Sequence, residues 1–294
     1  MDTLKCKVFL EAARLRSFAA AARALGYTTP NVSHIIGEME KELGVPLFYR
    51  KHAGVILTAN GERFIPLAKD FLAGEERMLS LAGEIRGLVT GTVRIGAYPS
   101  IVSYLLPPVI RTFRDKHPGV KLEIEERYRR DALSDLEQGF IDLAILSSSG
   151  PLDHERLQWI PLYEDDLVAV LPKDHRYAGR KSFPRKALAD EPFTYPGISS
   201  DDNDAGLFLE QHGIEPNTVY SALSNAAALG MVKEGLGISL LYRLSTTHWE
   251  NDVTLLKLDP PQKIELGIAV PDGREFLPGI RHFIDTATGI LAAD

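Results

Sequence analysis

The chain has 294 residues, a formal net charge of −7 and a hydrophobic content of 45%. This length exceeds the usual size of one domain and predicts two or three domains. The single cysteine, Cys6, excludes an internal disulfide and any metal site built from several cysteines. The N-terminal residues lack the pattern of a signal peptide, and no apolar run reaches the ~18 residues of a membrane span. We therefore expect a soluble cytoplasmic protein.

Charge is distributed unevenly along the chain. The first 60 residues contain 8 Lys and Arg against 5 Asp and Glu, a net charge of +3, which leaves −10 for the other 234 residues. Because contacts to phosphate require Lys and Arg, a small basic head on an acidic body permits nucleic-acid binding by the head.

Three short helices are predicted in this head, over residues 4–15, 18–25 and 28–43. Ser17 and Thr28 can cap the second and third helices, and Gly26 can end the second. In the third helix one apolar stripe is formed by Val32, Ile36, Met39 and Leu43. A helix, a tight turn and a second helix are typical of proteins that place the last helix in the major groove of DNA.

The polar face of the third helix carries the candidate DNA-contacting residues Thr28, Thr29, Pro30, Asn31, Ser33 and His34. After it, residues 47–50 and 55–57 predict a two-stranded wing with a cationic turn. Arg50, Lys51 and His52 are expected to contact phosphates there. A plain helical bundle with a solvated charged turn remains the alternative.

A long helix is predicted from Thr58 to about residue 88, with Pro66 as a possible kink. Its apolar residues recur at intervals of seven, at Phe64, Phe71, Met78 and Ile85. Such a heptad favours a helix pair, and therefore a dimer on a two-fold related operator. The alternative is a helix packed on the C-terminal part of its own chain.

The remaining chain alternates between strand and helix patterns. Strands are expected at residues 92–97, 120–126, 141–146, 167–172, 193–195, 238–241 and 264–270, and helices at 103–117, 131–139, 207–212, 226–234 and 276–291. This alternation predicts two α/β lobes. We expect a head at 1–58, a linker at 59–90 and an effector domain at 91–294, with lobe I at about 91–162 and 267–294 and lobe II at about 163–266.

Ligands of open α/β sheets bind beyond the carboxyl ends of the strands, near helix N-termini. This rule selects as candidate effector-binding residues Ser100, Ile101, Ser103, Ser147, Ser148, Tyr195, Ser199, Ser200, Ser224 and Asn225. Hydroxyl and amide groups suit a small anion, although each serine could instead cap a helix. The acidic run at 201–204 would repel an anion, and it is interpreted as a solvated loop, with a cationic effector or a metal ion as the alternative.

The residues at many positions of the chain resemble those of the family of LysR-type transcriptional regulators. In the head they are Ser17-Phe18, Ala21-Ala22, Leu25, Pro30, Ser33, Glu40, Leu43-Gly44-Val45-Pro46-Leu47-Phe48, Arg50, Leu57-Thr58 and Gly61. In the body they are Arg94-Ile95-Gly96, Leu105-Leu106-Pro107-Pro108, Phe113, His117-Pro118-Gly119-Val120, Gly139, Asp142-Leu143-Ala144, Glu191-Pro192-Phe193 and Gly235-Leu236-Gly237-Ile238. The resemblance thus covers essentially the whole chain.

The resemblance implies an α+β multidomain protein. Its parts would be an N-terminal winged helix-turn-helix, a long dimerising linker helix, and a two-lobed α/β domain like the periplasmic binding proteins, which binds a small effector. It further implies a carboxylate or a related metabolite as the effector and a tetramer on promoter DNA, and RNA polymerase is a further candidate partner. Thr28-Thr29 and His34 stand where the family usually has Ser-Gln and Arg, which leaves the operator sequence open.

Other classes of protein are less well supported. The chain lacks a phosphate-binding glycine loop, GxSxG, HExxH and any His and Cys cluster at metal-ligand spacing, so we expect neither an enzyme nor a cofactor or metal. The triplet Asp153-His154-Glu155 is interpreted as surface. The main alternative is a cytoplasmic small-solute receptor without DNA function, which footprinting at the upstream intergenic region would distinguish.

Overall fold

The computed structural model describes residues 1–51, 54–86, 89–148, 156–196, 204–222, 224–273 and 276–291. It forms two compact units, residues 1–91 and 92–294, and each is described here by itself. Within the described residues, no helix combines the length and the apolar character that crossing a membrane requires.

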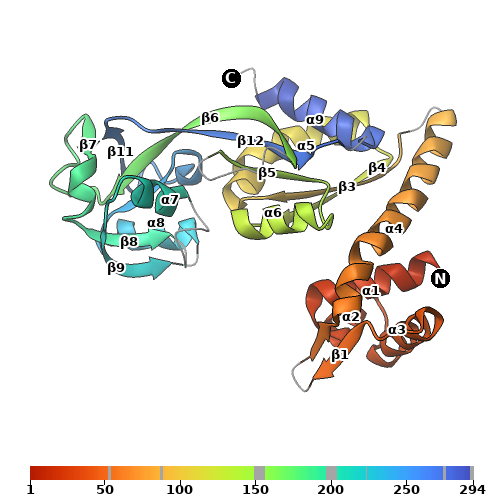
Figure 1. Ribbon diagram of the computed structural model, residues 1–294. Coiled ribbons are helices and arrows are strands. Elements are labelled where there is room, and N and C mark those ends of the chain that lie inside the picture. Colours follow the sequence, from red (N-terminus) through yellow and green to blue (C-terminus); the bar gives the residue numbers. More distant parts are fainter. Residues whose placement is uncertain are drawn as a thin grey trace. The chain divides into compact units, whose positions relative to one another are not determined.

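The first unit has four helices and a two-stranded wing in its described part (Figure 1). These elements are α1 (Thr3–Leu15), α2 (Phe18–Leu25), α3 (Thr29–Leu43), β1 (Phe48–Lys51), β2 (Gly54–Leu57) and α4 (Ala59–Ile85). The predicted caps are present. Ser17 accepts a hydrogen bond from the Ala20 N–H at 3.2 Å, and Gly26 ends α2 with φ at 72°. Local sequence signals therefore place the boundaries of α2.

Aromatic packing joins the wing to the helices. The ring of Phe48 in β1 lies edge-on to Phe9 and Phe18, with centroids 5.6 and 5.4 Å apart. Helix α3 buries Val32, Ile35, Ile36 and Met39. The predicted stripe is thus shifted slightly, because Ile35 is buried whereas Leu43 is only half-buried.

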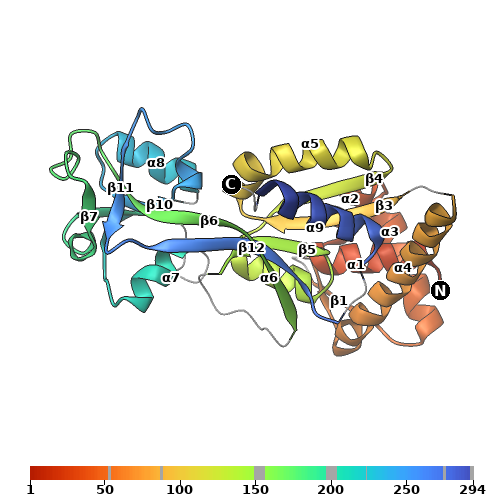
Figure 2. The same ribbon diagram turned by 90° about the horizontal axis from the view of Figure 1, so that it is seen from above.

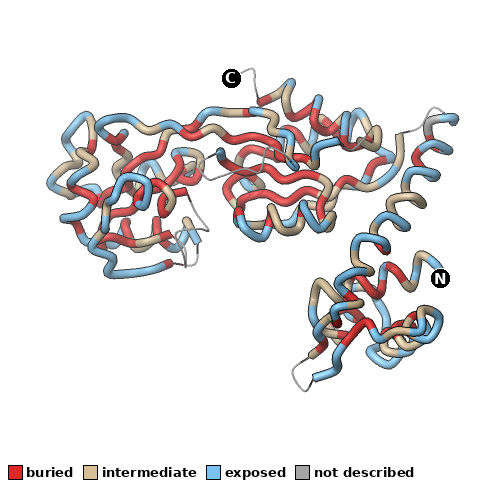
Figure 3. The backbone as a smooth tube through the Cα atoms, viewed as in Figure 1, coloured by how far each residue is buried: buried red, intermediate tan, exposed pale blue. Residues whose placement is uncertain are grey.

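The second unit has a mixed sheet in two lobes, shown in Figures 1 and 2. The first lobe contains β3 (Gly91–Ala97), η1 (Ile101–Leu105), α5 (Leu106–Lys116), β4 (Val120–Glu126), α6 (Arg129–Glu137), β5 (Leu143–Ser147) and α9 (Pro278–Leu291). The second lobe contains β7 (Ser182–Pro184), η2 (Arg185–Leu188), β8 (Pro192–Pro196), α7 (Asp204–Gln211), β9 (Asn217–Ala222), α8 (Asn225–Lys233), β10 (Ser239–Tyr242), η4 (Leu244–Thr246) and β11 (Thr254–Asp259). Figure 3 shows the central strands of both lobes as buried, which places a core in each.

Two long strands, β6 (Leu157–Leu171) and β12 (Lys263–Pro271), run through both lobes and pair with each other antiparallel. The sheet order is β4-β3-β5-β12-β6-β11-β7, with β10 also paired to β6. A register shift interrupts the β6–β12 ladder between Leu266 and Gly267. A side chain at Gly267 would meet the Trp159 ring and the Ile160 carbonyl oxygen, so the two strands approach closely there.

Several elements differ from the sequence-based prediction. The first half of β6 was not predicted, nor were β7, β9 and β11. The expected helix at 103–117 begins instead with a π-helical turn, η1, and becomes α-helical at Leu106. Pro107 and Pro108 explain the change, since proline lacks an N–H and its ring clashes with the carbonyl four residues earlier.

Gly61 in the first turn of α4 provides a test of how the wing packs on that helix. An added Cβ would lie 2.2 Å from the Leu47 carbonyl oxygen, whereas a Cβ at Gly37 in α3 would meet nothing within 4 Å. We expect Gly61→Ala to lower the free energy of unfolding by about 1–3 kcal/mol, because backbone must move. Gly37→Ala should leave it unchanged or raise it by up to ~1 kcal/mol. Chemical denaturation of both variants checks this, and equal effects would contradict the packing.

Candidate functional site

The N-terminal end of α3 presents a polar surface to solvent. Thr28, Thr29, Pro30, Asn31 and His34 are exposed there. The Thr28 hydroxyl caps the helix by accepting from the Asn31 N–H at 3.4 Å, and Pro30 lies in the first turn. An exposed, capped helix end with short polar side chains has the form of a recognition helix that reads base edges.

The wing is tied to this helix by two polar contacts. The Arg50 guanidinium in β1 donates to the Ser33 hydroxyl at 3.1 Å and lies 5.6 Å from the centre of the Phe18 ring. The Glu40 carboxylate in α3 accepts from the backbone N–H groups of Leu47 and Phe48 at 2.7 and 3.1 Å. The wing and α3 are therefore held in a fixed relation, which a DNA-binding surface made of both requires.

Two further predicted DNA-contacting positions lie at the end of the wing. Lys51 is exposed at the end of β1, where a phosphate could reach it. His52 lies outside the described residues. The imidazole Nε2 of His34 lies 3.6 Å from Glu38, and its side chain is 73% exposed.

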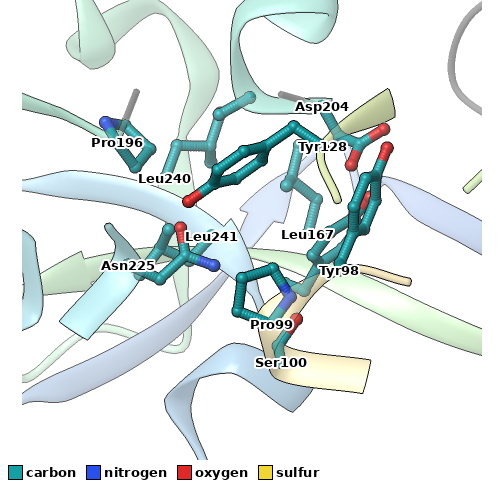
Figure 4. Close-up of a pocket in the computed structure, with 12 residues that line it drawn as sticks. Tyr98, Pro99, Ser100, Tyr128, Leu167, Pro196, Asp204, Asn225, Leu240 and Leu241 are labelled. Atoms are coloured by element: carbon teal, nitrogen blue, oxygen red, sulfur yellow. The ribbon is translucent and has the colours of Figure 1, made fainter. Parts of the chain in front are cut away.

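In the second unit a cavity lies between the two lobes (Figure 4). From the first lobe it is lined by Tyr98, Pro99, Ser100 and Tyr128. From the second lobe it is lined by Leu167, Pro196, Asp204, Ala205, Asn225 and residues 240–242. Its volume is about 30 Å³, which is room for one or two water molecules. An effector of ordinary size therefore requires the lobes to move apart.

A buried polar contact involves Asp204, one of the residues that line this cavity. The Ser147 hydroxyl at the end of β5 donates to the carboxylate of Asp204, the first residue of α7, and so joins the two lobes. The guanidinium of Arg129 donates to the Ser147 carbonyl oxygen at 2.6 Å. All three residues are at most 5% exposed. Burial of charged groups is costly unless they are hydrogen-bonded, and these two hydrogen bonds offset part of that cost.

Two tyrosines of the lining carry buried hydroxyls. Tyr98 and Tyr242 stack with ring centroids 6.4 Å apart; the Tyr242 hydroxyl has no hydrogen-bond partner in the part of the chain that the structure describes, whereas the Tyr98 hydroxyl lies beside Ser147 and Arg129. Burial, and then the nearby Asp204 charge, raise the pKa of Tyr98 well above its ordinary value. The Tyr98 hydroxyl therefore stays protonated and can donate to a ligand.

The predicted effector-binding residues are distributed over several environments. Ser100 and Asn225 line the cavity, with the Asn225 Nδ2 donating to Ser245 Oγ at 3.0 Å. Ser147 is not among the lining residues, but its hydroxyl donates to the carboxylate of Asp204, which lines the cavity. The remaining described candidates are not among the lining residues: they are Ile101, Ser103, Ser148, Tyr195 and Ser224.

Each of those five has another structural setting. Ile101 is fully buried in η1, whereas Ser103 and Ser148 are exposed. Tyr195 in β8 is half-buried beside the Phe193 ring, and the Ser224 hydroxyl caps α8 by accepting from the Ala227 N–H at 3.2 Å. The other two candidates, Ser199 and Ser200, lie outside the described residues, as do the first residues of the acidic run, 201–203.

Sequence reasoning did not select Tyr98, Tyr128, Arg129 and Tyr242. The rule that selected Ser100, its position after β3, applies equally to Tyr98. Arg129 begins α6 just after β4, but nothing local indicates that its charge is buried. Within the described residues, no three His, Cys, Asp or Glu side chains are grouped so as to hold a metal ion.

Comparison with known proteins gives the family of both units. Residues 5–62 match the family model described as "Bacterial regulatory helix-turn-helix protein, lysR family", and residues 86–291 match "LysR substrate binding domain". The chain is 29% identical over its whole length to the whole of an uncharacterized HTH-type transcriptional regulator, YvbU, of Bacillus subtilis (strain 168). It is 30% identical to a probable hydrogen peroxide-inducible genes activator of Streptomyces viridosporus, over 89% of this chain and 88% of that protein.

A solved structure shows the same relationship. It is described as a cysteine-to-serine mutant of Corynebacterium glutamicum OxyR with H2O2 bound, and is 26% identical to this chain with a TM-score of 0.61. The match covers 98% of this chain and 92% of that one. The chain thus belongs to the LysR family of bacterial transcriptional regulators, with a DNA-binding head and an effector-binding domain.

Proposed function

We propose that α3 and the wing bind promoter DNA in the major groove and along the phosphates, and that a small molecule bound between the lobes modulates this binding in the cytoplasm. The exposed polar end of α3, fixed to Arg50 through Ser33, carries the first part of the proposal. The cavity that joins residues of both lobes carries the second part. Membership of a family of regulators agrees with the expectation that the chain is not an enzyme.

We further propose a dimer formed through α4. Its apolar residues are exposed in the single chain: Leu67, Phe71, Met78, Leu79, Leu81 and Ile85 are between 47% and 79% exposed. Large exposed apolar side chains along one helix indicate a partner surface, and a second copy of the helix supplies it with the heptad spacing already noted. Two such dimers on one promoter would form a tetramer that can contact RNA polymerase.

Peroxide sensing by a thiol in the effector domain is not supported, although two matched proteins have names that mention peroxide. The only cysteine, Cys6, is buried in α1, and burial raises its pKa, which makes the thiol less reactive. A non-covalent ligand in the cavity between the lobes accounts better for the effector. The sequence-based expectation is a small anion such as a carboxylate, and its charge is considered further below.

The DNA-binding proposal is tested by placing negative charge on the exposed face of α3. Ser33→Glu combined with His34→Glu should weaken binding to the upstream intergenic region by about 100-fold or more, because carboxylates would meet base edges and phosphates. Lys41→Glu changes the net charge by the same two units in the exposed last turn of α3 and should retain most of the affinity. Footprinting at a fixed salt concentration checks this, and unchanged protection by the double variant would contradict it.

The dimer proposal is tested at Met78, which is 74% exposed. Met78→Glu should weaken dimerisation at least tenfold, because a charge would be buried in an apolar helix pair. The neighbouring variant Arg77→Gln makes the same one-unit change in charge and should leave the dimer intact. Sedimentation velocity over a concentration series measures both, and a dimer of unchanged stability in Met78→Glu would rule out this interface.

Effector control is tested by a thermal-shift screen of metabolites. A ligand at about 100 times its dissociation constant adds about 2.7 kcal/mol to the stability of the folded state. A compound found in this way should change the length of the footprint or the bend of the operator DNA. Identical footprints and bends with and without a tightly bound ligand would contradict the coupling.

A further inference from the structure

The charge of the cavity lining is one-sided. Among the described residues that line it, Asp204 is the only one with a charged side chain. The others are three tyrosines, prolines, aliphatic residues, Ser100 and Asn225. Asp204 is 3% exposed, so its carboxylate is removed from bulk water, and its charge is screened less than that of a surface residue. Among the described lining residues a ligand therefore meets one acidic side chain and no basic one.

Two tyrosine hydroxyls in the same lining can bond to a ligand. Tyr98 and Tyr242 are 5% and 6% exposed; the Tyr242 hydroxyl has no hydrogen-bond partner among the described residues, and the Tyr98 hydroxyl lies beside Ser147 and Arg129. Figure 4 shows the Tyr98 hydroxyl directed toward the Asp204 carboxylate. Buried polar groups in folded proteins are nearly always paired. The unpaired Tyr242 hydroxyl thus favours a ligand that supplies a hydrogen-bonding group.

Two neighbouring residues hold the Asp204 carboxylate in place. Ser147 donates to this carboxylate, and Arg129 donates to the backbone oxygen of Ser147. Arg129 is not among the lining residues. The Arg129 guanidinium is thus bound to the Ser147 backbone, while the acidic side chain that a ligand meets in the cavity is Asp204.

We propose that the effector carries a primary ammonium group on an apolar or aromatic body, and that Asp204 and Tyr98 bind this group. This rests on the proposed function of the cavity as the effector site. An ammonium group has three donors, which match a carboxylate and tyrosine oxygens. The faces of Tyr98, Tyr128 and Tyr242 add cation–π attraction, and Leu167 and Leu240 contact the apolar body.

This ligand class differs from the small anion expected from the serines. A carboxylate ligand would meet the carboxylate of Asp204 in a cavity with little water, whereas an ammonium ligand would neutralise it. Because the cavity has a volume of only about 30 Å³, the ligand enters by separating the lobes. When the ligand binds, Asp204 loses its hydrogen bond to Ser147 of the other lobe and bonds to the ligand instead. Because that hydrogen bond joins the lobes, ligand binding directly affects how the lobes are arranged.

The test uses the full-length protein and matched pairs of probes of opposite charge. Benzylammonium is compared with benzoate, and butylammonium with butyrate, by isothermal titration at constant ionic strength. We expect the ammonium member of at least one pair to bind at least tenfold more tightly than its carboxylate. Asp204→Asn should weaken ammonium binding at least tenfold, and Tyr98→Phe should weaken it two- to tenfold.

Asp252→Asn is the matched control, because Asp252 lies outside the cavity and pairs with Lys233 at 2.7 Å. It should leave ammonium binding unchanged. Tighter binding of the carboxylates, no binding of either ammonium probe, or equal ammonium affinity in Asp204→Asn would each overturn the proposal. The affinities of the wild-type protein for the ammonium and carboxylate members of each pair test the proposal even if Asp204→Asn fails to fold. An anionic effector that still altered operator binding would overturn this inference alone and leave the proposed function standing.

Discussion

A buried hydrogen bond from the Ser147 hydroxyl to the Asp204 carboxylate joins the two lobes at the cavity. It places a buried acidic group of the second lobe against the end of a central strand of the first. Removing such a group from water is unfavourable unless it is well bonded, so the contact persists only while the lobes hold this arrangement. A ligand that bonds to Asp204 in its place changes which lobe arrangement is most stable.

The strands β6 and β12 determine how such a change can occur. Both run through the two lobes, and their ladder has a register shift at Leu266 and Gly267. A bulge of this kind interrupts regular pairing and allows a bend or twist. The two lobes can therefore change their angle at this point while each keeps its own core. Ligand binding and lobe angle are then linked, and the linkage extends to DNA only if the head binds its operator differently in the two states.

The helices of the head were predictable because their signals are local. Spacing of apolar residues, the Ser17 and Thr28 caps and the Gly26 terminus all lie within a few residues of the helices that they define. The first half of β6 was missed because Pro161 and the acidic residues 164–166 interrupt any strand-like alternation. That segment is a strand because it pairs with β12, about a hundred residues later in the chain.

The candidate site was predictable only in part, for the same reason. Ser100 and Asn225 were found from the rule that ligands bind beyond strand ends and at helix N-termini, and both line the cavity. Asp204 lay in a run that was interpreted as a solvated loop, yet it is buried. Its burial depends on α7 packing toward the end of β5, which no local pattern reveals. The acidic lining in turn favours a cationic effector over the anion that the serines suggested.

The central claim is that the cavity between the lobes and the DNA-binding head are energetically coupled. The most direct test is reciprocal: the affinity for the compound with the largest thermal shift is measured with and without saturating operator DNA, and the affinity for the operator with and without that compound. The account predicts that both affinities change by the same factor, different from one, because coupling between two sites must be equal in both directions. An effector affinity that does not change when the operator is bound would contradict it.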